Sequence, residues 1–326
     1  MDKKKLLKIL DRMNNTSVMV LGDIMMDKFV WGKVSRISPE APVPIVEIEK
    51  ETHTPGGAGN VAMNVCSLDS KVLLVGVIGN DFVGDKLINE MSRGGIDTTG
   101  VFRDDKRPTI LKTRIIAQHQ QVVRTDREII GKLSAQLTKQ ITTFLDENIS
   151  RVKAVVISDY GKGVISPVIL KKAVSLARKH KKPIVVDPKV EHFQQYKQVS
   201  CITPNQSEAA LGMREHSVPE GEGLIKLGKT ILKKLHCESL LVTQGEKGML
   251  LFESRGKITH IPTVARDVFD VSGAGDTVIA VLTLALAAKA SILDAAQIAN
   301  YAAGIVVGKL GTATTSIKEI KNKIRG

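Results

Sequence analysis

The 326-residue sequence is poor in aromatic side chains, in cysteine and in long apolar runs. Because aromatic residues make up only 3% of the chain, platforms for stacking nucleic-acid bases are scarce. The cysteines (Cys66, Cys201 and Cys237) are widely spaced without a Cys-x-x-Cys pair, which excludes a disulfide scaffold and a cysteine zinc site and indicates a reducing compartment. The longest apolar run, residues 278–288, is too short to cross a bilayer and is typical of a buried helix.

The charge balance is one-sided, with 47 Lys and Arg against 34 Asp and Glu and a net charge of +13. Such an excess favours anionic partners such as nucleic acid, phosphorylated metabolites or acidic membranes. The basic residues between 171 and 182 punctuate a helical pattern, so we interpret them as a solvated face and expect no nucleic-acid or membrane partner. The basic amino terminus has no apolar segment of the signal-peptide kind, which predicts a cytoplasmic protein.

Short β-branched runs alternate with longer amphipathic stretches along the chain. The runs that predict buried strands are 18–21, 72–78, 154–157, 184–186, 239–242 and 249–252. The stretches that predict helices include 134–149, 166–180 and 222–235. From about residue 150 this order is regular, which predicts an α/β fold with a mainly parallel central sheet flanked by helices.

Residues 30–50 and 101–125 interrupt that order with strand-like alternation and no helical pattern. We interpret them as a small antiparallel sheet that projects from the main body as a lid. No internal repeat or low-complexity linker is present, so residues 1–326 are expected to form a single domain that includes these lid segments.

Carboxylates follow or end three of the predicted strands: Asp23, Asp159 and Asp187. Ligands of open α/β sheets bind in the crevice at the carboxyl ends of the strands. A single aspartate in such a place is more often a turn former or a helix cap. Three together begin to outline a binding site.

The strongest local signal is the segment 270–276, Asp-Val-Ser-Gly-Ala-Gly-Asp, which directly precedes the apolar run. Backbone N–H groups of Gly273, Ala274 and Gly275 at a helix start, together with the helix dipole, form an anion site. Asp276 in the first turn either complements the dipole or acts as a general base. For this segment alone, dipole complementation is the favoured interpretation.

Glycine and asparagine motifs accompany this segment. Thr243, Gly245 and Gly248 follow a predicted strand, where the glycines allow close backbone approach to a phosphate or ribose or else form a hairpin turn. Asn205 and Glu208, at i and i+3, present oxygen ligands suited to a hydrated Mg²⁺ or form a helix capping box.

Nearer the amino terminus, Gly56, Gly57 and Asn60 lie in a glycine-rich entry to a helix. This entry either permits close packing or lets a polyol lie against the backbone while Asn60 binds its hydroxyls. Asp23 and Asp27 add two carboxylates suited to sugar hydroxyls.

Four of these motifs occur in an order and spacing that match one family along nearly the whole chain. Gly56-Gly-Ala-Gly-Asn60, Asn205-x-x-Glu208, Thr243-x-Gly-x-x-Gly248 and the segment 270–276 together resemble the ribokinase-like (PfkB) carbohydrate kinases. Four separated motifs in register are far more specific than any one of them. The resemblance implies a ribokinase-like fold.

Further segments resemble the D-glycero-D-manno-heptose 7-phosphate kinases within that family. They are residues 35–45, 120–126, 158–163, 187–189 and 308–312. Asp69, Val190 and Val281 depart from the family pattern, and Val190 lies near the expected sugar site. In many bacteria this kinase is fused to a nucleotidylyltransferase domain; because the sequence ends at Gly326 without a His-x-Gly-His motif, we expect a kinase-only protein or a kinase half.

The resemblance implies transfer of the ATP γ-phosphoryl group to a sugar hydroxyl. Asp276 would be the general base, and the N–H groups of residues 273–275 would stabilise the developing charge. Asn205 and Glu208 would position Mg²⁺ through water. The nucleotide would be bound by Thr243, Gly245, Gly248 and Asn300.

On the sugar side, the resemblance implies binding of heptose 7-phosphate and formation of heptose 1,7-bisphosphate, a precursor of the ADP-heptose of lipopolysaccharide. The residues expected around the sugar hydroxyls are Asp23, Asp27, Gly56, Gly57, Asn60 and Asp187. Arg114, Arg124 and Lys189 are the expected cations for the phosphate already present.

The family resemblance and the apolar strand at residues 43–48 predict a homodimer formed through the lid. Three alternatives stay open. They are a kinase of the same fold acting on ribose or fructose 1-phosphate, a non-catalytic sugar-phosphate sensor, and a nucleic-acid-binding protein favoured by charge alone.

Overall fold

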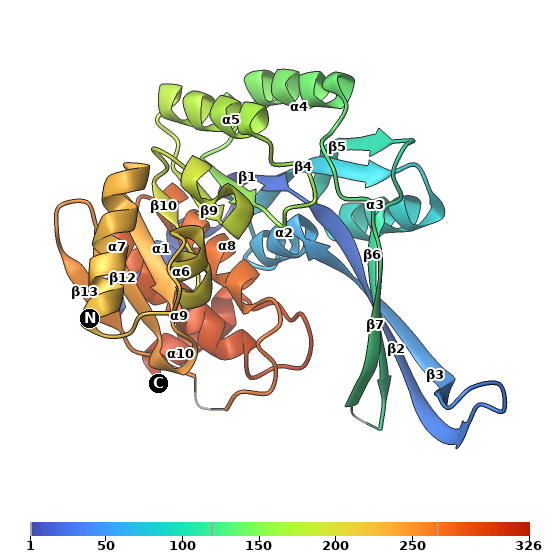
Figure 1. Ribbon diagram of the computed structural model, residues 1–326. Helices are drawn as coiled ribbons and strands as arrows, with labels where there is room; N and C mark the ends of the chain where they lie inside the picture. Colours follow the sequence, from blue (N-terminus) through green and yellow to red (C-terminus); the bar gives the residue numbers. More distant parts are fainter. Residues whose placement is uncertain (1, 119, 266) are drawn as a thin grey trace.

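The computed structural model describes residues 2–118, 120–265 and 267–326, and its centre is a nine-stranded sheet (Figure 1). The strands are β1 (Ser17–Gly22), β4 (Lys71–Gly79), β5 (Asp97–Asp104), β8 (Ala154–Ser158), β9 (Ile184–Asp187), β10 (Cys201–Ile202), β11 (Ser239–Thr243), β12 (Met249–Glu253) and β13 (Ile258–Ile261). Their order is β13-β12-β11-β10-β9-β8-β1-β4-β5, and the pairings from β11 to β5 are all parallel. Only β12 and β13 add in antiparallel fashion, so the mainly parallel sheet is confirmed.

Helices cover both faces of this sheet. One face carries α1 (Lys3–Met13), α2 (Ala58–Cys66), α3 (Phe82–Arg93), α8 (Ala274–Ala287), α9 (Ile292–Val306) and α10 (Ile317–Arg325). The other carries α4 (Ala135–Asn148), α5 (Pro167–Lys179), α6 (Gln206–Gly212) and α7 (Glu222–Leu235). Alternate residues of β1 enter the two cores: Val18 and Val20 belong to the core that contains α8, whereas Met19 and Leu21 belong to the core covered by α4 to α7. Among the described helices, none is long and apolar enough to cross a membrane.

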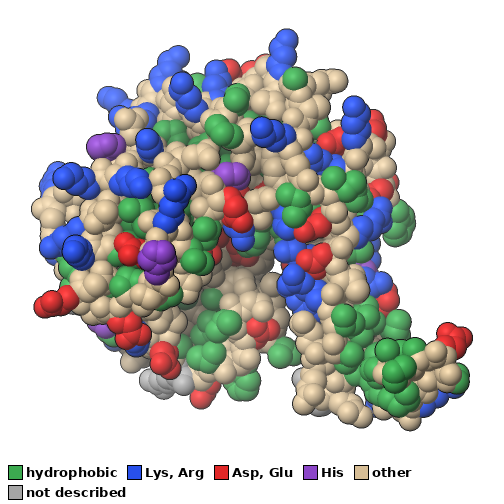
Figure 2. All heavy atoms as spheres, in the orientation of Figure 1, with side chains coloured by type: hydrophobic (Ala, Val, Ile, Leu, Met, Phe, Trp, Pro, Cys, Tyr) green, Lys and Arg blue, Asp and Glu red, His purple; other side chains and the backbone are tan. Residues whose placement is uncertain are grey.

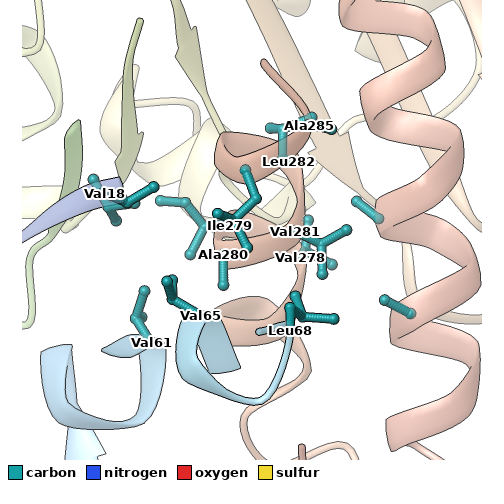
Figure 3. Packing of buried hydrophobic residues seen from close by; sticks show 14 of the residues in the cluster. Val18, Val61, Val65, Leu68, Val278, Ile279, Ala280, Val281, Leu282 and Ala285 are labelled. Atoms are coloured by element: carbon teal, nitrogen blue, oxygen red, sulfur yellow. The ribbon is translucent and has the colours of Figure 1, made fainter. Parts of the chain in front are cut away.

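Helix α8 is the predicted buried helix, and nearly all of its side chains are enclosed. It packs against Val61 and Val65 of α2, Leu68 beyond it, and Val18 of β1 (Figure 3). Each buried Val, Leu or Ile contributes about 1.5–3 kcal/mol relative to an exposed side chain. The amino end of α8 is therefore fixed to one of the two hydrophobic cores.

Four further strands form a second sheet that projects from the main body (Figure 1). They are β2 (Ile24–Ile37), β3 (Pro44–Gly57), β6 (Ile110–Ala117) and β7 (Gln120–Arg127), in the order β3-β2-β6-β7. We call this sheet the lid. The β2–β3 and β6–β7 pairs are antiparallel as expected, but the central β2–β6 pair is parallel.

The second lid segment is shorter than the sequence predicts. Residues 101–104 belong to β5 at the edge of the large sheet, so the lid strand begins at Ile110. The same alternation of apolar and polar residues fits an edge strand of either sheet, so it does not locate the boundary between them.

The β2–β3 pair of the lid is continuous with the main body at two points, Asp23 and Gly57. Asp23 alone separates β1 from β2, and β3 runs directly into α2 at Gly57. Gly57 has a φ of 56°, and a Cβ there would lie 2.4 Å from the carbonyl oxygen of Asp23. The N–H of Ala58 donates to that same oxygen at 3.0 Å, which closes the junction.

Candidate active site

Asp276 lies buried at the first turn of α8, 5% exposed. Its Oδ2 accepts a hydrogen bond from the Asn60 Nδ2 at 2.7 Å, and its Oδ1 accepts one from the Tyr160 hydroxyl at 2.8 Å. Burial raises the pKa of Asp276 to about 6, while the two donated bonds oppose that rise. A carboxylate with such a pKa is well suited to take a proton near neutral pH.

The glycine that precedes α8 permits this contact. Gly273 has a left-handed φ of 77°, and a Cβ there would lie 2.8 Å from the Asn60 Nδ2. The N–H of Ala274 donates to the Val271 carbonyl at 3.2 Å, so one of the three amides expected to bind an anion is already paired. The N–H groups of Gly275 and Asp276 belong to the first turn, whose amides have no acceptor within the helix.

A cavity of about 550 Å³ lies beside this helix start. It is lined by Thr243, Gly245, Gly248 and Asn300, and also by Ala274 and Gly275. The sequence-predicted nucleotide residues are therefore brought together against the amino end of α8. The side chain of Asn300 donates to the Pro262 carbonyl at 2.8 Å, which fixes its amide at the wall of the cavity.

Gly245 and Gly248 also form the turn between β11 and β12, which confirms the hairpin interpretation of this motif. Their φ angles are 57° and 86°. A Cβ on Gly248 would lie 2.2 Å from the Ile261 carbonyl oxygen, whereas one on Gly245 would meet nothing within 4 Å. Gly248 is thus required by packing, and Gly245 leaves open space on the cavity wall.

Asn205 and Glu208 form a capping box at the start of α6. The Glu208 N–H donates to the Asn205 Oδ1 and the Asn205 N–H donates to the Glu208 Oε2, both at 2.8 Å. Burial raises the pKa of Glu208, which the nearby positive charge of Lys189 opposes. The capping interpretation is confirmed, and the pair still stands at the carboxyl edge of the sheet.

Burial and mutual repulsion disfavour the ionised forms of the carboxylates at this edge. Burial, followed by the charges of Asp276 and Glu208, raises the pKa of Asp187 well above its ordinary value. Among the residues that the structure describes, no three His, Cys, Asp or Glu side chains gather as a metal cage. The side-chain oxygens of Asn205 and Glu208 are of the kind that Mg²⁺ takes, since Mg²⁺ keeps several waters and is held by one or two carboxylates together with substrate phosphates.

On the lid side, Asp27 pairs with the Arg114 Nη1 and is 7% exposed. A Cβ on Gly56 would lie 2.2 Å from the Asp27 Oδ2, so the bare backbone of β3 lets this carboxylate sit there. Asp27 and Asp276 are close enough that the charge of Asp27 contributes to the raised pKa of Asp276.

Asp23 has a different environment from the one expected of a sugar ligand. Its Oδ2 accepts the N–H groups of Tyr160 and Lys162 at 2.9 and 3.0 Å, and its Oδ1 accepts that of Val164 at 3.0 Å. Both oxygens are occupied by backbone and the side chain is 1% exposed. Its contacts correct the expectation: Asp23 holds the loop after β8.

The three cations expected to bind a phosphate lie in separate surroundings. Arg114 pairs with Asp27 and lies over the Phe29 ring, 5.3 Å from its centroid. Arg124 pairs with Asp126 at 2.9 Å, with half of its side chain exposed. Lys189 lies against Gly161, where a Cβ would be 3.3 Å from its Cγ. Arg114 alone of the three contacts a predicted sugar residue.

Two residues that sequence reasoning did not assign lie at the centre of the site. Tyr160 contacts Asp276 directly, and the Lys112 ammonium lies 5.8 Å from the centroid of the Tyr160 ring. Burial lowers the pKa of Lys112, and no carboxylate in the described parts of the chain forms an ion pair with it. The alternation of β6 was the available signal, because it places Lys112 on the same face as Arg114.

Comparison with known proteins places this arrangement in a family. Residues 15–319 match the pfkB family of carbohydrate kinases, and the chain belongs to that family. It is a carbohydrate kinase by that membership. The expectation drawn from the four motifs is therefore confirmed.

Curated relatives named "Bifunctional protein HldE" align over most of the chain. The protein of Geotalea uraniireducens is 42% identical over 320 residues, covering 98% of this chain and 65% of the relative. That of Helicobacter pylori strain J99 is 44% identical over 303 residues, covering 93% and 65%. The chain thus spans about two thirds of the length of these relatives.

Solved structures share the fold at low sequence identity. Phosphofructokinase-2 from Escherichia coli, in complex with potassium, superposes with a TM-score of 0.80 at 17% identity, covering 95% of this chain and 98% of that one. Ribokinase from Arabidopsis thaliana, complexed with ribose and ATP, gives 0.74 at 17% identity, covering 96% and 99%. These similarities confirm the ribokinase-like fold.

The contacts of Asp23 predict a large stability cost for Asp23→Asn. The amide can keep one acceptor oxygen but turns an NH₂ group toward backbone donors, so we expect unfolding free energy to fall by about 2–4 kcal/mol. Urea unfolding measures the loss. The control is Asp146→Asn, which removes a pair with Lys172 whose side chains are 36% and 47% exposed and should cost less than about 1 kcal/mol. Equal losses in the two variants would contradict the role given to Asp23.

Proposed function

We propose that this chain transfers the γ-phosphoryl group of ATP to the C1 hydroxyl of D-glycero-β-D-manno-heptose 7-phosphate. The product would be heptose 1,7-bisphosphate, a precursor of the ADP-heptose of lipopolysaccharide, made in the cytoplasm. The single observation that carries a kinase reaction is the place of Asp276, between the nucleotide cavity and the sugar-side residues Asp27 and Asn60. The heptose assignment rests on the subfamily segments and on the similarity to the proteins named HldE.

In this reaction the acceptor hydroxyl oxygen attacks the γ-phosphorus of ATP. The bond from that phosphorus to the oxygen bridging to the β-phosphate breaks, and ADP leaves with the electron pair. Asp276 accepts the hydroxyl proton, a contribution of roughly 10²–10⁴ in rate. The first-turn amides of α8, with the positive end of its dipole, stabilise the charge on the group in transfer.

ATP fits the cavity bounded by the β11–β12 turn and α9, with its phosphates directed toward the amino end of α8. Mg²⁺ would be held through water by Asn205 and Glu208, the outer groups of the α6 capping box. It would neutralise phosphate charge and relieve the repulsion among the buried carboxylates at this edge.

The acceptor would lie between Asp27, Asn60 and the bare backbone of Gly56 and Gly57. Beyond them, a cavity of about 430 Å³ separates the lid from the 310–312 segment. Phe29, Trp31, Thr52 and Thr54 line its lid side. This space suits the carbon tail of a seven-carbon sugar.

We propose that Arg114 and Lys112 bind the phosphate that the acceptor already carries. Both side chains extend from the site-facing side of β6. Arg124 stays a candidate only if its pair with Asp126 opens. Lys189 lies on the Glu208 side, so we assign it to the ATP phosphates.

A panel of acceptors tests the substrate. With ATP and Mg²⁺, a coupled ADP-release assay should give turnover with heptose 7-phosphate and little with ribose or fructose 1-phosphate. Lys112→Met should raise KM for heptose 7-phosphate by about 10-fold, because one charge-assisted contact is lost, and leave KM for ATP unchanged. Lys139→Met on the far face of α4 is the matched control. Preferential turnover of ribose would refute the heptose assignment while leaving a kinase of the same fold.

Replacing the base should separate chemistry from binding. We expect Asp276→Asn to lower kcat by about 10³-fold, because the amide cannot take the proton, with the affinity for a non-hydrolysable ATP analogue unchanged. For the unaltered protein, kcat/KM should fall as the pH drops through about 6, because protonation of Asp276 removes the base. A flat profile between pH 5 and pH 8, or full turnover in the variant, would exclude this role.

We also propose that two copies pair through their lids. Large apolar side chains are exposed there: Ile37 (60%), Val43 (51%), Ile48 (60%), Val122 (42%) and Val123 (45%). Figure 2 shows hydrophobic side chains gathered over the outer part of the lid. The strands β3 and β7 are also unpaired edges of the sheet, which need cover.

Analytical ultracentrifugation, which measures the mass of the protein in solution, tests the dimer. The chain should sediment as a species of twice its 35.3 kDa mass, and Ile48→Lys should shift it toward monomer by placing a charge in the contact. Val168→Lys, at an equally exposed valine on α5, should leave the dimer intact. A monomeric parent protein would reject the proposal.

A further inference from the structure

The loop after β8, residues 158–164, is held in place from two sides. On one side, Asp23 accepts the backbone N–H groups of Tyr160, Lys162 and Val164, all within 3.0 Å. Three charge-assisted bonds to one buried carboxylate fix the backbone on both sides of Gly161.

On the other side, Asp159 is held within the main body. Its Oδ1 accepts the Gly161 N–H at 2.8 Å, and its Oδ2 lies 2.7 Å from both the His192 Nδ1 and the Tyr196 hydroxyl. His192 lies in the 3₁₀ helix Val190–Gln195, and Tyr196 is the residue that ends this helix. The side chain of Asp159 has no exposed surface.

The glycines of the loop are required by close approach. Gly163 has a φ of 110°, and a Cβ there would lie 2.0 Å from the Gly131 carbonyl oxygen. The Arg107 guanidinium, paired with Asp104 at 2.8 Å, also donates to the Lys162 carbonyl at 3.3 Å. A surface loop with no function would not need two buried carboxylates, a guanidinium and a left-handed glycine to set its path.

This fixed loop delivers one side chain to the base. The Tyr160 hydroxyl donates to the Asp276 Oδ1 at 2.8 Å, across 116 residues of sequence. We propose that Tyr160 is a positioning residue of the phosphoryl transfer, which orients the Asp276 carboxylate through this hydrogen bond. Asp23 and Asp159 position Tyr160 in turn.

Two donors on two different oxygens define the plane of the Asp276 carboxylate. Asn60 holds Oδ2 from α2, and Tyr160 holds Oδ1 from the β8 loop. Each oxygen retains a further lone pair, so an acceptor hydroxyl can still donate to the carboxylate. Loss of either donor lets the carboxylate rotate away from the line of attack, which reduces the rate even when binding is unchanged.

The charges around Asp276 explain why a donor is needed. The charge of Asp27 from β2 disfavours the ionised form of Asp276, and the charge of Asp276 in turn raises the pKa of Asp187 on β9. Burial, together with the charge of Asp276, keeps the pKa of Tyr160 far above its ordinary value, so the hydroxyl remains a donor. The Lys112 ammonium of β6 lies over the Tyr160 ring, 5.8 Å from its centroid. The Tyr160 hydroxyl therefore helps to keep the base charged at neutral pH.

The test is Tyr160→Phe, which keeps the ring and the backbone bonds to Asp23 and removes only the hydroxyl. We expect kcat to fall about 10-fold near pH 7.5 with KM for ATP unchanged. The acid limb of kcat/KM should move up by about one pH unit, so that the loss is larger at pH 6 than at pH 8.5. Tyr301→Phe on α9 is the matched control and should keep the parent profile. An unshifted limb would overturn the inference.

A double-mutant cycle provides a second readout. If Tyr160 acts through Asp276, Tyr160→Phe should cause no further loss in the Asp276→Asn background. An equal loss in both backgrounds would indicate a merely structural role and reject the proposal. A thermal midpoint and ATP-analogue binding for each variant establish that it is folded.

The inference rests on the kinase reaction proposed above and not on the identity of the sugar. If no acceptor supports turnover in the parent protein, the proposed function fails. If the parent turns over an acceptor but Tyr160→Phe leaves the pH profile unchanged, only the role of Tyr160 fails.

Discussion

The structure depends on keeping one carboxylate ionised inside the protein. Asp276 lies at the amino end of a helix whose remaining side chains are almost all apolar, so the side chains of that helix cannot compensate its charge. The helix dipole, the Asn60 amide and the Tyr160 hydroxyl supply that compensation from three different elements. Gly273, with no side chain, makes room for the first of these contacts. The glycines, the buried asparagine and the anchored loop all follow from this one requirement.

The half of the site that is proposed to bind the nucleotide could be predicted from the sequence because its signals are local. A glycine pair after a strand, a capping box and a Gly-Ala-Gly helix start each specify backbone geometry within a few residues. Strands that run parallel bring their carboxyl ends to one edge, so Asp187, Asn205 and Thr243 had to converge. The structure collects these motifs as expected, with Ala274 already hydrogen-bonded as the exception.

The lid half could not be predicted in the same way because its roles depend on partners distant in sequence. Nothing local distinguishes Asp23, enclosed by backbone donors, from Asp27, which pairs with Arg114 of the neighbouring lid strand. The parallel pairing of β2 with β6 sets which residues of β2 lie beside Lys112 and Arg114. The alternation of apolar and polar residues does not predict that register. Tyr160 was missed for the same reason, since its partner lies 116 residues away.

The junction between the lid and the large sheet has a mechanical consequence. The β2–β3 pair of the lid leaves the main body at Asp23 and returns at Gly57, whereas β6 and β7 join the main body separately, after β5 and before α4. A swing of β2 and β3 would pivot at this junction, and displacement would grow with distance along β2. At about 3.3 Å per residue, a rotation of about 10° carries Asp27 by about 2 Å but Trp31 by more than about 4 Å. Such a swing would thus displace the lid residues beside Asp276 less than the lid residues around the far end of the acceptor.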